Sequence, residues 1–555
     1  MKVFFLTILF VVFSGFYHRE ISGGSDTKPS EVSYASDKNF IRRFLPRKDE
    51  TDVYVRGQKI ETFPLINEFY ETRQYESFWT TEYLPAPFAD KMISFFSSVR
   101  NFGLEPSFYR LDELEELRSE LILETERKQY RQMSYELEVM LSNSCFLFMS
   151  HLKNGVLKTD TLLNDHRFSS IHSGFAEMLE KQINRNNFRE LLQLQPKRYE
   201  YVHLQKAIEN YLRHNELQFD SITIPDPEID SAGCYSITRE ILAAKGYLSD
   251  TLQDGDSLLI DALKKFQKAY GIQPDGIVGK DVREVLAMNS FDWYLVAAIN
   301  LERLKWEKFS EANYVLINVP SFQLKIYEND SVKNVFKVIV GTHWGRTPDI
   351  TSKIDQIITH PIWTVPRSIA VWEILPQIKR NPNYLKRKKY RFYDQFENEV
   401  DPNKINWDLI TSGNFNYRIR QDRGGSNPLG MVKFNFKSPY SIYLHDTPEK
   451  DLFGNGIRSL SHGCIRLQYP LEFLNYLLRR ENNPLKTDSI NSCLNNNMGV
   501  KFNLDHPISI YTRYYTCLAD SNGNLQFYFD IYQKDKELKR SFLKMNKLLV
   551  VEGTE

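Results

Sequence analysis

The chain has few cysteines and no excess of either charge. No two of the cysteines form a C-x-x-C pair, which excludes a cysteine-rich zinc site, and they are too scattered for a disulfide framework. The 71 basic and 71 acidic side chains cancel, so no global field favours nucleic acid or a membrane surface. The five cysteines are Cys145, Cys234, Cys464, Cys493 and Cys517.

Long apolar runs are also rare, and the one near the N-terminus indicates export. It extends from Val3 to Phe16 behind Lys2 and is shorter than the ~20 residues that a membrane-spanning helix needs. We therefore expect residues 1–23 to be a signal peptide, with a membrane anchor as the alternative. Outside the cytoplasm, an odd number of cysteines leaves at least one thiol free or paired between chains. Cys145 is predicted to be buried, and Cys493 and Cys517 are candidates for a pair.

The composition and length predict a folded protein of several units. Hydrophobic residues make up 42% of the 555 residues and aromatic residues 14%, which excludes a disordered chain. Apolar spacings of three and four residues predict an α-helical scaffold domain over residues 40–225. A three-helix module over residues 233–290 follows the linker TIPDPEID, and a connecting helix is expected over residues 291–311.

Alternating apolar residues predict a β-rich domain over residues 312–540. Within it, residues 366–425 lose the alternation and contain the helical stretch IAVWEILPQIKR and the basic stretch NPNYLKRKKYR, so we expect a helical insertion there. The predicted fold class is therefore α+β and multidomain.

The free thiol of greatest chemical interest is Cys464 in SHGCIRL. In SPYSIYLHDTP, nineteen residues upstream, the alternation sends Ile442 and Leu444 to the core and Tyr443 and His445 to the other face. A second strand can return Cys464 beside His445. A histidine at this distance would accept the thiol proton, which a cysteine nucleophile requires because few free thiols are ionised at neutral pH.

Neighbouring residues suit the same chemistry. Gly463 permits close approach of the backbone, and its N–H with that of Cys464 could stabilise an oxyanion. Arg466 suits a substrate carboxylate. Read singly, these residues are more simply a structural cysteine, a core histidine and a surface arginine.

SHGCIRL together with YLHDTP resembles the catalytic signature of the L,D-transpeptidases. NPLGMVKFNF, DIYQKD and the helical lobe are similar to the large, multidomain periplasmic branch of that family, and ALKKFQKAYGIQPDGIVG resembles a peptidoglycan-binding type 1 module. The resemblance implies an enzyme whose cysteine attacks a tetrapeptide stem, releases D-alanine and passes the acyl group to the side-chain amine of a second stem. It also implies acylation by carbapenems.

The resemblance assigns roles residue by residue. Cys464 matches the nucleophile and His445 the general base, which the family often orients with a backbone carbonyl. Ser461, His462 and Gly463 match the nucleophile loop, Tyr443 a pocket tyrosine and Arg466 the motif arginine. His462 is the likeliest wrong choice of base, and Asp446 is expected to cap a turn. No cofactor and no metal are implied. The expected partners are stem peptides and glycan strands, with penicillin-binding proteins as further candidates and no nucleic acid.

Three other functions remain open. Water could resolve the same acyl-enzyme, which would make the protein an L,D-carboxypeptidase. A β domain without activity would make it a wall-binding scaffold. A zinc peptidase could draw on His343, His360, His445 and His462, although no H-x-x-x-H spacing supports it.

The insertion is expected to resemble a substrate-capping subdomain. Trp372, Ile374 and Leu375 would give apolar cover, and its basic residues would hold stem carboxylates. A solvated basic face on a tolerated loop is the alternative. The basic residues are Lys379, Arg380, Lys386, Arg387, Lys388 and Lys389.

Overall fold

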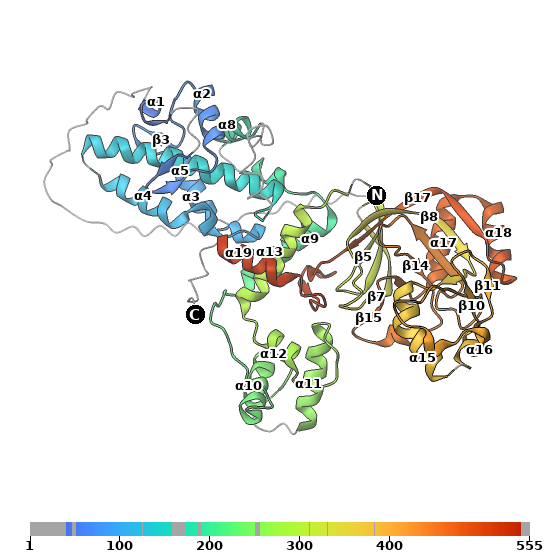
Figure 1. Cartoon of the computed structure of the whole chain (residues 1–555). Helices are drawn as coiled ribbons and strands as arrows, with labels where there is room; N and C mark the ends of the chain where they lie inside the picture. Colours follow the sequence, from blue (N-terminus) through green and yellow to red (C-terminus); the bar gives the residue numbers. More distant parts are fainter. Residues whose placement is uncertain are drawn as a thin grey trace, which may run out of the picture.

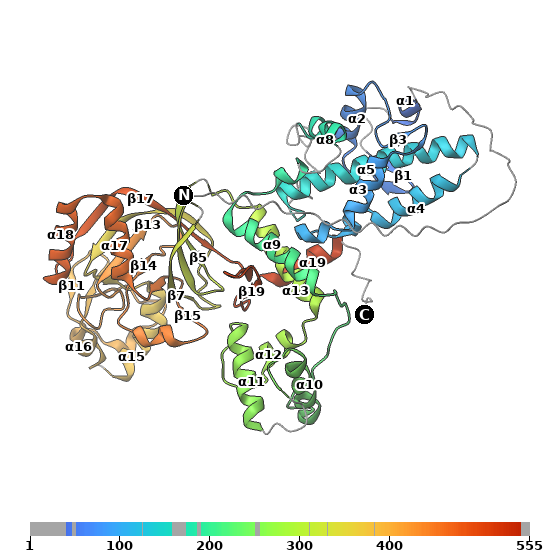
Figure 2. The same ribbon diagram turned by 180° about the vertical axis from the view of Figure 1, so that it is seen from behind.

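The computed structural model describes residues 40–46, 52–124, 126–157, 174–185, 190–249, 256–309, 311–329, 331–381 and 383–545. The expected signal peptide lies outside these residues. A helical lobe and a β domain stand on opposite sides of the central helices α9 (Tyr199–His214) and α13 (Ser290–Lys305), and a small helical module lies beside them (Figure 1). The view from behind shows the same arrangement (Figure 2). The α+β multidomain class predicted from the sequence is confirmed.

The helical lobe is organised around the long helix α5 (Arg127–Asn154). A buried carboxylate on α5, that of Glu138, accepts hydrogen bonds from the backbone N–H groups of Trp79 and Thr80 at 2.9 and 2.7 Å, so it fixes the turn that leads into β3. Further described elements of the lobe are α1 (Phe40–Phe44), β1 (Tyr54–Val55), β2 (Gln58–Lys59), α2 (Phe63–Thr72), β3 (Thr80–Thr81), β4 (Leu84–Pro85), α3 (Pro87–Phe96), α4 (Leu111–Leu123) and α8 (Phe175–Arg185).

The three-helix module contains α10 (Ser231–Ala244), α11 (Asp256–Ala269) and α12 (Lys280–Leu286). Its core includes Leu242, Phe266 and Leu286, as the periodicity predicts. The turn between α11 and α12 is held by the buried side chain of Gln267, which accepts from the N–H of Gly276 at 2.8 Å. Cys234 is buried in the same core.

The helix expected to connect the module to the β domain is α13 (Ser290–Lys305), one of the two central helices. A capping box between Asn289 and Asp292 begins it. Because α13 is covered on nearly every side, its ion pair between Glu302 and Lys305 has no exposed side-chain surface. Glu302 also accepts from the N–H of Val156 at 2.6 Å, which ties the end of α5 to the centre of the molecule.

The β domain is a sheet that closes on itself. The strands follow the order β15-β7-β16-β14-β13-β8-β17-β5-β6, and the additional pairing of β6 with β7 completes a ring. Helices α17 (Pro470–Glu481) and α18 (Pro484–Asn495) contribute to the same core. The strands are β5 (Asn313–Asn318), β6 (Gln323–Glu328), β7 (Ser331–Gly341), β8 (Ile350–Thr359), β13 (Val432–Phe436), β14 (Leu444–His445), β15 (Ser459–Ser461), β16 (Ile465–Leu467) and β17 (Lys501–Arg513).

Side-chain alternation gives the sheet an apolar inner face and a polar outer face. On β13, Val432 and Phe434 are fully buried, and the ring of Phe434 packs edge-on against Phe473 of α17 at 5.0 Å. Lys433 and Asn435 therefore point to the outer face. They are only partly buried there.

The C-terminal elements leave the sheet and pack on the central helices. The hairpin of β18 (Cys517–Ala519) and β19 (Leu525–Phe527) contacts α9, and α19 (Asp535–Met545) packs on α13. Phe542 lies against Phe108 of the helical lobe, with 5.2 Å between ring centroids. The expected β domain of residues 312–540 thus includes segments whose apolar side chains belong to the core of the lobe.

The insertion differs from the helical segment that the sequence predicts. It begins with α14 (Arg367–Ile369), a π-helical turn (Ala370–Ile374), α15 (Leu375–Arg380) and α16 (Tyr384–Lys388). It continues as strands β10, β11 and β12, which join β9, the strand just before the insertion, in a second sheet of order β11-β10-β12-β9 around a core of its own. The strands are β9 (Trp363–Thr364), β10 (Tyr390–Tyr393), β11 (Glu399–Val400) and β12 (Arg418–Gln421).

Candidate functional site

Two short parallel strands bring the predicted reactive residues together. β14 pairs with β16 so that His445 lies opposite Arg466 and Leu444 opposite Ile465. The N–H of Ile465 donates to the carbonyl of Tyr443 at 3.0 Å, which extends the pairing by one residue. Cys464 therefore stands level with Tyr443 and one step from His445. Among the described residues, no hydrogen bond joins the Cys464 sulfur to the His445 ring.

The nucleophile loop is held closed by Ser461. The Ser461 hydroxyl donates to the carbonyl of Cys464 at 2.5 Å and accepts from the N–H of Gly463 at 3.1 Å. Gly463 has a φ of +117°, a conformation that side chains rarely adopt, so the position requires glycine. The expected oxyanion donor at Gly463 is thus already engaged. The Cys464 N–H makes no hydrogen bond to another described residue and is the remaining candidate donor.

A second loop, which extends from Gly341 to Thr347, packs against the nucleophile loop. The buried Thr347 hydroxyl donates to the Gly463 carbonyl at 2.8 Å. Tyr532, from the C-terminal DIYQKD stretch, donates to the carbonyl of Gly341 at 2.6 Å and accepts from the N–H of Thr347 at 3.0 Å. Gly345 lies against the backbone of His462, where a β-carbon would come within 3.1 Å of the His462 Cα. Neither Thr347 nor Tyr532 was predicted from the sequence to support the nucleophile.

His445 is a neutral base at physiological pH. Burial lowers the pKa of its imidazole to about 3, and the positive charges of Arg466 and Lys433 add to this effect, whereas the carbonyl of Asp446 opposes it. That carbonyl lies 2.5 Å from Nδ1. Because a carbonyl can only accept, Nδ1 carries the hydrogen and Nε2 keeps its lone pair for a proton. The family resemblance implied a histidine oriented by such a backbone carbonyl.

The thiol is also kept in its neutral form at rest. Burial raises the pKa of Cys464, while hydrogen bonds from the N–H and the hydroxyl of Tyr443 and the charges of Lys433 and Arg466 oppose the increase. Burial also raises the pKa of the Tyr443 hydroxyl, so that the hydroxyl remains a donor. The resting pair is therefore a thiol and a neutral imidazole, and not the thiolate and imidazolium that proximity alone suggests.

Lys433 is a member of this site that the sequence analysis did not single out. It lies directly opposite His445 in the pairing of β13 with β14. Its Nζ stands 3.7 Å from the centroid of the Tyr443 ring. Burial lowers the pKa of Lys433, and the negative charge of Cys464 opposes that shift. The alternation of VKFNF, which places Lys433 on the same face as His445, was the signal that could have identified it.

Two of the predicted site residues, Arg466 and His462, contact carboxylates of the protein itself. Arg466 Nη1 lies 2.5 Å from Oε2 of the more exposed Glu449. A substrate carboxylate would have to displace Glu449. His462 Nε2 contacts Oε1 of Glu373 in the π-helical turn of the insertion, so this ring joins the nucleophile loop to the insertion and does not serve as the base.

The insertion offers less apolar cover than expected. Trp372 is 73% exposed beside Glu373, but Ile374 and Leu375 are buried in the insertion's own core and cannot contact a substrate. The basic residues Lys379, Arg380, Arg387 and Lys389 are exposed, whereas the side chain of Lys386 lies outside the described part of the structure.

Other predicted residues have structural roles. Asp446 accepts from the N–H groups of Met431 and Thr447, both at 2.7 Å, as expected of a turn-capping residue. His360 shares a hydrogen bond with the carbonyl of Leu494 at 2.9 Å. Within the described ranges, no cluster of histidine, cysteine, aspartate and glutamate side chains could hold a metal ion. Cys493 and Cys517 are free thiols and do not form the suggested pair, and Cys145 is buried as predicted.

Comparison with known proteins gives a family match over the domain that contains these residues. Residues 312–487 match the family model of the L,D-transpeptidase catalytic domain, residues 64–208 that of a scaffold domain, and residues 237–286 that of a "putative peptidoglycan binding domain". Over 233 residues the chain is 34% identical to a "Putative L,D-transpeptidase" of Haemophilus influenzae. The alignment covers 41% of this chain and 45% of that relative, so it spans about half of the relative's length.

A solved L,D-transpeptidase from Stackebrandtia nassauensis is also similar, with 15% identity and a TM-score of 0.17 over 54% of this chain and 95% of that one. The resemblance stated from the sequence is confirmed by the family models and the relative. The chain carries an L,D-transpeptidase catalytic domain together with a peptidoglycan-binding domain.

Proposed function

We propose that this chain, with its L,D-transpeptidase catalytic domain, cross-links peptidoglycan through an acyl-enzyme on Cys464. The observation that carries the proposal is the parallel pairing of β14 with β16, which sets the thiol level with Tyr443 and beside a neutral His445. A buried, base-competent imidazole next to a partly exposed cysteine is the arrangement that nucleophilic catalysis requires.

In the first half of the reaction, the Cys464 sulfur attacks the carbonyl of the third residue of a tetrapeptide stem. The thiol proton passes to His445 Nε2 as the carbon–sulfur bond forms. His445 then gives this proton to the nitrogen of the departing D-alanine as the peptide bond breaks. The Cys464 N–H serves as the oxyanion donor, and the Tyr443 hydroxyl stabilises charge on sulfur.

In the second half, the side-chain amine of another stem attacks the thioester. His445 accepts a proton from this amine, a new amide bond forms, and the proton returns to the sulfur as the carbon–sulfur bond breaks. If water attacks instead, the product is a tripeptide stem. The proportion of the two products therefore decides between transpeptidase and carboxypeptidase activity.

Peptidoglycan is the proposed substrate because a glycan-binding module accompanies the catalytic domain. A cavity of about 650 Å³ lies where the module meets α13 and the C-terminal hairpin, and it is lined by Tyr270, Trp293 and Tyr528 among others. Aromatic side chains with polar neighbours suit the faces and hydroxyls of sugar rings. His343, in the loop that packs against the nucleophile loop, also lines this cavity.

We further propose that the protein acts in the periplasm, where its substrate is found. The expected signal peptide of residues 1–23 is the basis for this location. In the described part of the chain, no helix is long and apolar enough to cross a membrane.

The function is tested with purified protein and defined tetrapeptide muropeptides, followed by mass spectrometry. We expect cross-linked dimers and free D-alanine, and loss of both in Cys464→Ala and His445→Ala. A carbapenem should add its mass to the Cys464 peptide. An adduct on Cys493 or Cys517, with turnover preserved in Cys464→Ala, would disprove the assignment.

A further inference from the structure

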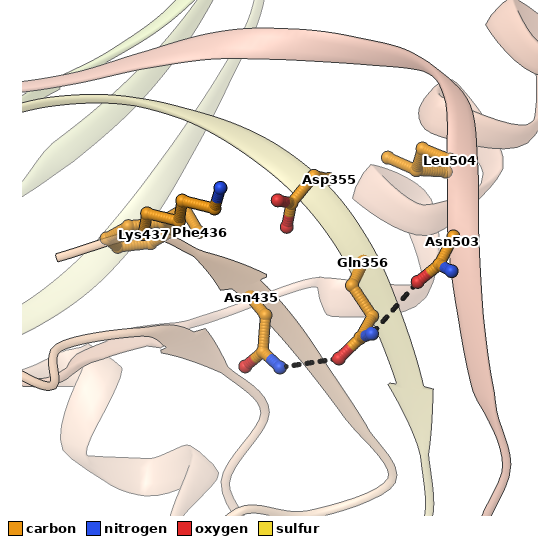
Figure 3. Close-up of a pocket in the computed structure, with 7 residues that line it drawn as sticks. All are labelled: Asp355, Gln356, Asn435, Phe436, Lys437, Asn503 and Leu504. Carbon is orange, nitrogen blue, oxygen red and sulfur yellow. Dashed lines mark hydrogen bonds between the residues drawn. The ribbon is translucent and has the colours of Figure 1, made fainter.

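A second pocket lies on the outer face of the catalytic sheet, away from the thiol. Its volume is about 520 Å³, and it lies over β8, β13 and β17 (Figure 3). The side chains of Asn435, Gln356 and Asn503 point toward one another there. The remaining lining residues are Asp355, Phe436, Lys437 and Leu504.

The three amides form a continuous row across three strands. Asn435 donates to Gln356 Oε1, and Gln356 donates to Asn503 Oδ1, both at 2.9 Å. The pairings place all three residues in one register, with Asn435 and Asn503 each opposite Gln356. β-bulges interrupt both pairings immediately beyond this row, which opens the sheet locally and accounts for the hollow.

The amide row continues into the nucleophile. Lys433 lies opposite His445, so continuing the antiparallel register by two residues sets Asn435 beside Tyr443. In the parallel pairing of β14 with β16, Tyr443 stands level with Cys464. One line across the sheet therefore contains Cys464, Tyr443, Asn435, Gln356 and Asn503.

A second line, which contains the basic residues Arg466, Lys433 and Lys501, runs beside this row on the same face. It comprises Arg466, His445, Lys433, Ile358 and Lys501, in the order that the strand registers give. The two lines differ in chemistry. The amide row offers both hydrogen-bond donors and acceptors, whereas the neighbouring row offers positive charge.

We propose that the amide row is the subsite for the peptide of the donor stem, which lies extended across the strands with its third carbonyl at Cys464. An extended peptide presents alternating N–H and C=O groups, which amide side chains satisfy in either sense. Stem carboxylates would face Lys433 and Lys501. This assignment rests on the proposed function, because it takes a peptidoglycan stem as the substrate.

The dimensions fit this occupant. Adjacent strands lie ~4.8 Å apart, so β16 and β8 are separated by three intervals, or ~14 Å. Three extended residues span ~10 Å. A stem attacked at its third residue would therefore span about two of these intervals and reach Asn435 on β13, and its sugar-linked end would lie between Asn435 and Gln356.

The test measures binding separately from catalysis. In the Cys464→Ala background, calorimetry would give the dissociation constant of a soluble stem tetrapeptide, with and without Gln356→Met. We expect binding to weaken roughly fivefold to tenfold, the effect of losing one or two neutral hydrogen bonds. Asn503→Ala, at an exposed position that cannot threaten the core, should have a smaller effect in the same direction. Gln323→Met on β6, three strands away from β8, is the matched control and should leave binding unchanged.

Kinetics then identify which stem occupies the pocket. With Cys464 restored, Gln356→Met should raise the KM for the donor and leave the KM for the acceptor amine and the rate of Cys464 alkylation by iodoacetamide unchanged. A rise confined to the acceptor KM would overturn the donor assignment. Unchanged tetrapeptide binding in both variants would overturn the subsite altogether. Absence of turnover in the wild type would disprove the proposed function, whereas the binding measurement would still decide the subsite.

Discussion

Replacing Lys433 with methionine tests whether this side chain keeps Cys464 ionisable. β13 and β16 are separated by β14, so the Lys433 charge acts on the sulfur over ~10 Å. At an effective dielectric constant of about 20, Coulomb's law gives about 1.7 kcal/mol, and solvent on the exposed side of Lys433 reduces this to roughly one pKa unit. Removing the cation should therefore raise the Cys464 pKa further by about one unit, because the thiolate loses a stabilising charge.

The assay is the pH dependence of Cys464 alkylation by iodoacetamide, followed by mass spectrometry of the Cys464 peptide. In Lys433→Met the profile should move to higher pH, and the rate on the acidic limb should fall about tenfold. Lys433→Arg keeps the charge and should keep the profile. Because burial lowers the pKa of Lys433 itself, the wild-type and methionine profiles should approach each other at alkaline pH, where the lysine is neutral. An identical profile in a folded Lys433→Met protein would refute the electrostatic argument.

Three further outcomes follow from the site. The pKa of His445 is about 3 in the folded protein and near 6.5 in the unfolded chain, so the unfolded chain binds the proton first. The free energy of unfolding should therefore fall as the pH drops below about 6.5, and it should fall less in His445→Gln. Melting temperatures at several pH values would show this difference. Tyr532→Phe removes the hydroxyl that holds Gly341 and Thr347, and it should slow acylation of Cys464 by a carbapenem while leaving the melting temperature within a few degrees; an unchanged acylation rate would separate this tyrosine from the nucleophile loop. Replacing residues 366–425 with a Gly-Ser linker should keep Cys464 acylation but shift the products from dimers to tripeptides, since the insertion would no longer exclude water; an unchanged ratio in a folded variant would remove the insertion from that role.

The sequence predicts the parts of this site that rest on local periodicity. Alternation in SPYSIYLHDTP correctly separates the buried Leu444 from the outward-facing Tyr443, and the helical spacing of the module anticipates its core at Phe266 and Leu286. Such patterns are legible because strands repeat every two residues and helices every 3.6. The same rule applied to VKFNF would have placed Lys433 beside His445.

The features that the sequence does not predict depend on contacts between distant segments. The contact of His462 with Glu373 joins residues 89 positions apart, and that of Tyr532 with Gly341 joins residues 191 positions apart, so neither leaves a periodic signal. The small sheet of the insertion was missed because its strands are only two to four residues long and carry charged residues such as Arg391 and Arg420. Short strands of that composition do not differ from loops in a single sequence.

The electrostatics of the site also explain how a reactive cysteine can persist outside the cytoplasm, where the protein is proposed to act. A thiol exchanges with disulfides through its thiolate, so a raised pKa protects it. Burial raises the pKa of Cys464 and lowers that of His445, which makes the resting ion pair unfavourable. In the proposed attack on a substrate, the proton moves to His445 only as the new bond forms, and the Tyr443 hydroxyl and the Lys433 charge then stabilise the developing negative charge on sulfur. The same burial that holds the thiol inert at rest thus leaves an unprotonated base beside it. The reactivity of Cys464 then depends on a substrate carbonyl that the outer face of the sheet holds next to the sulfur.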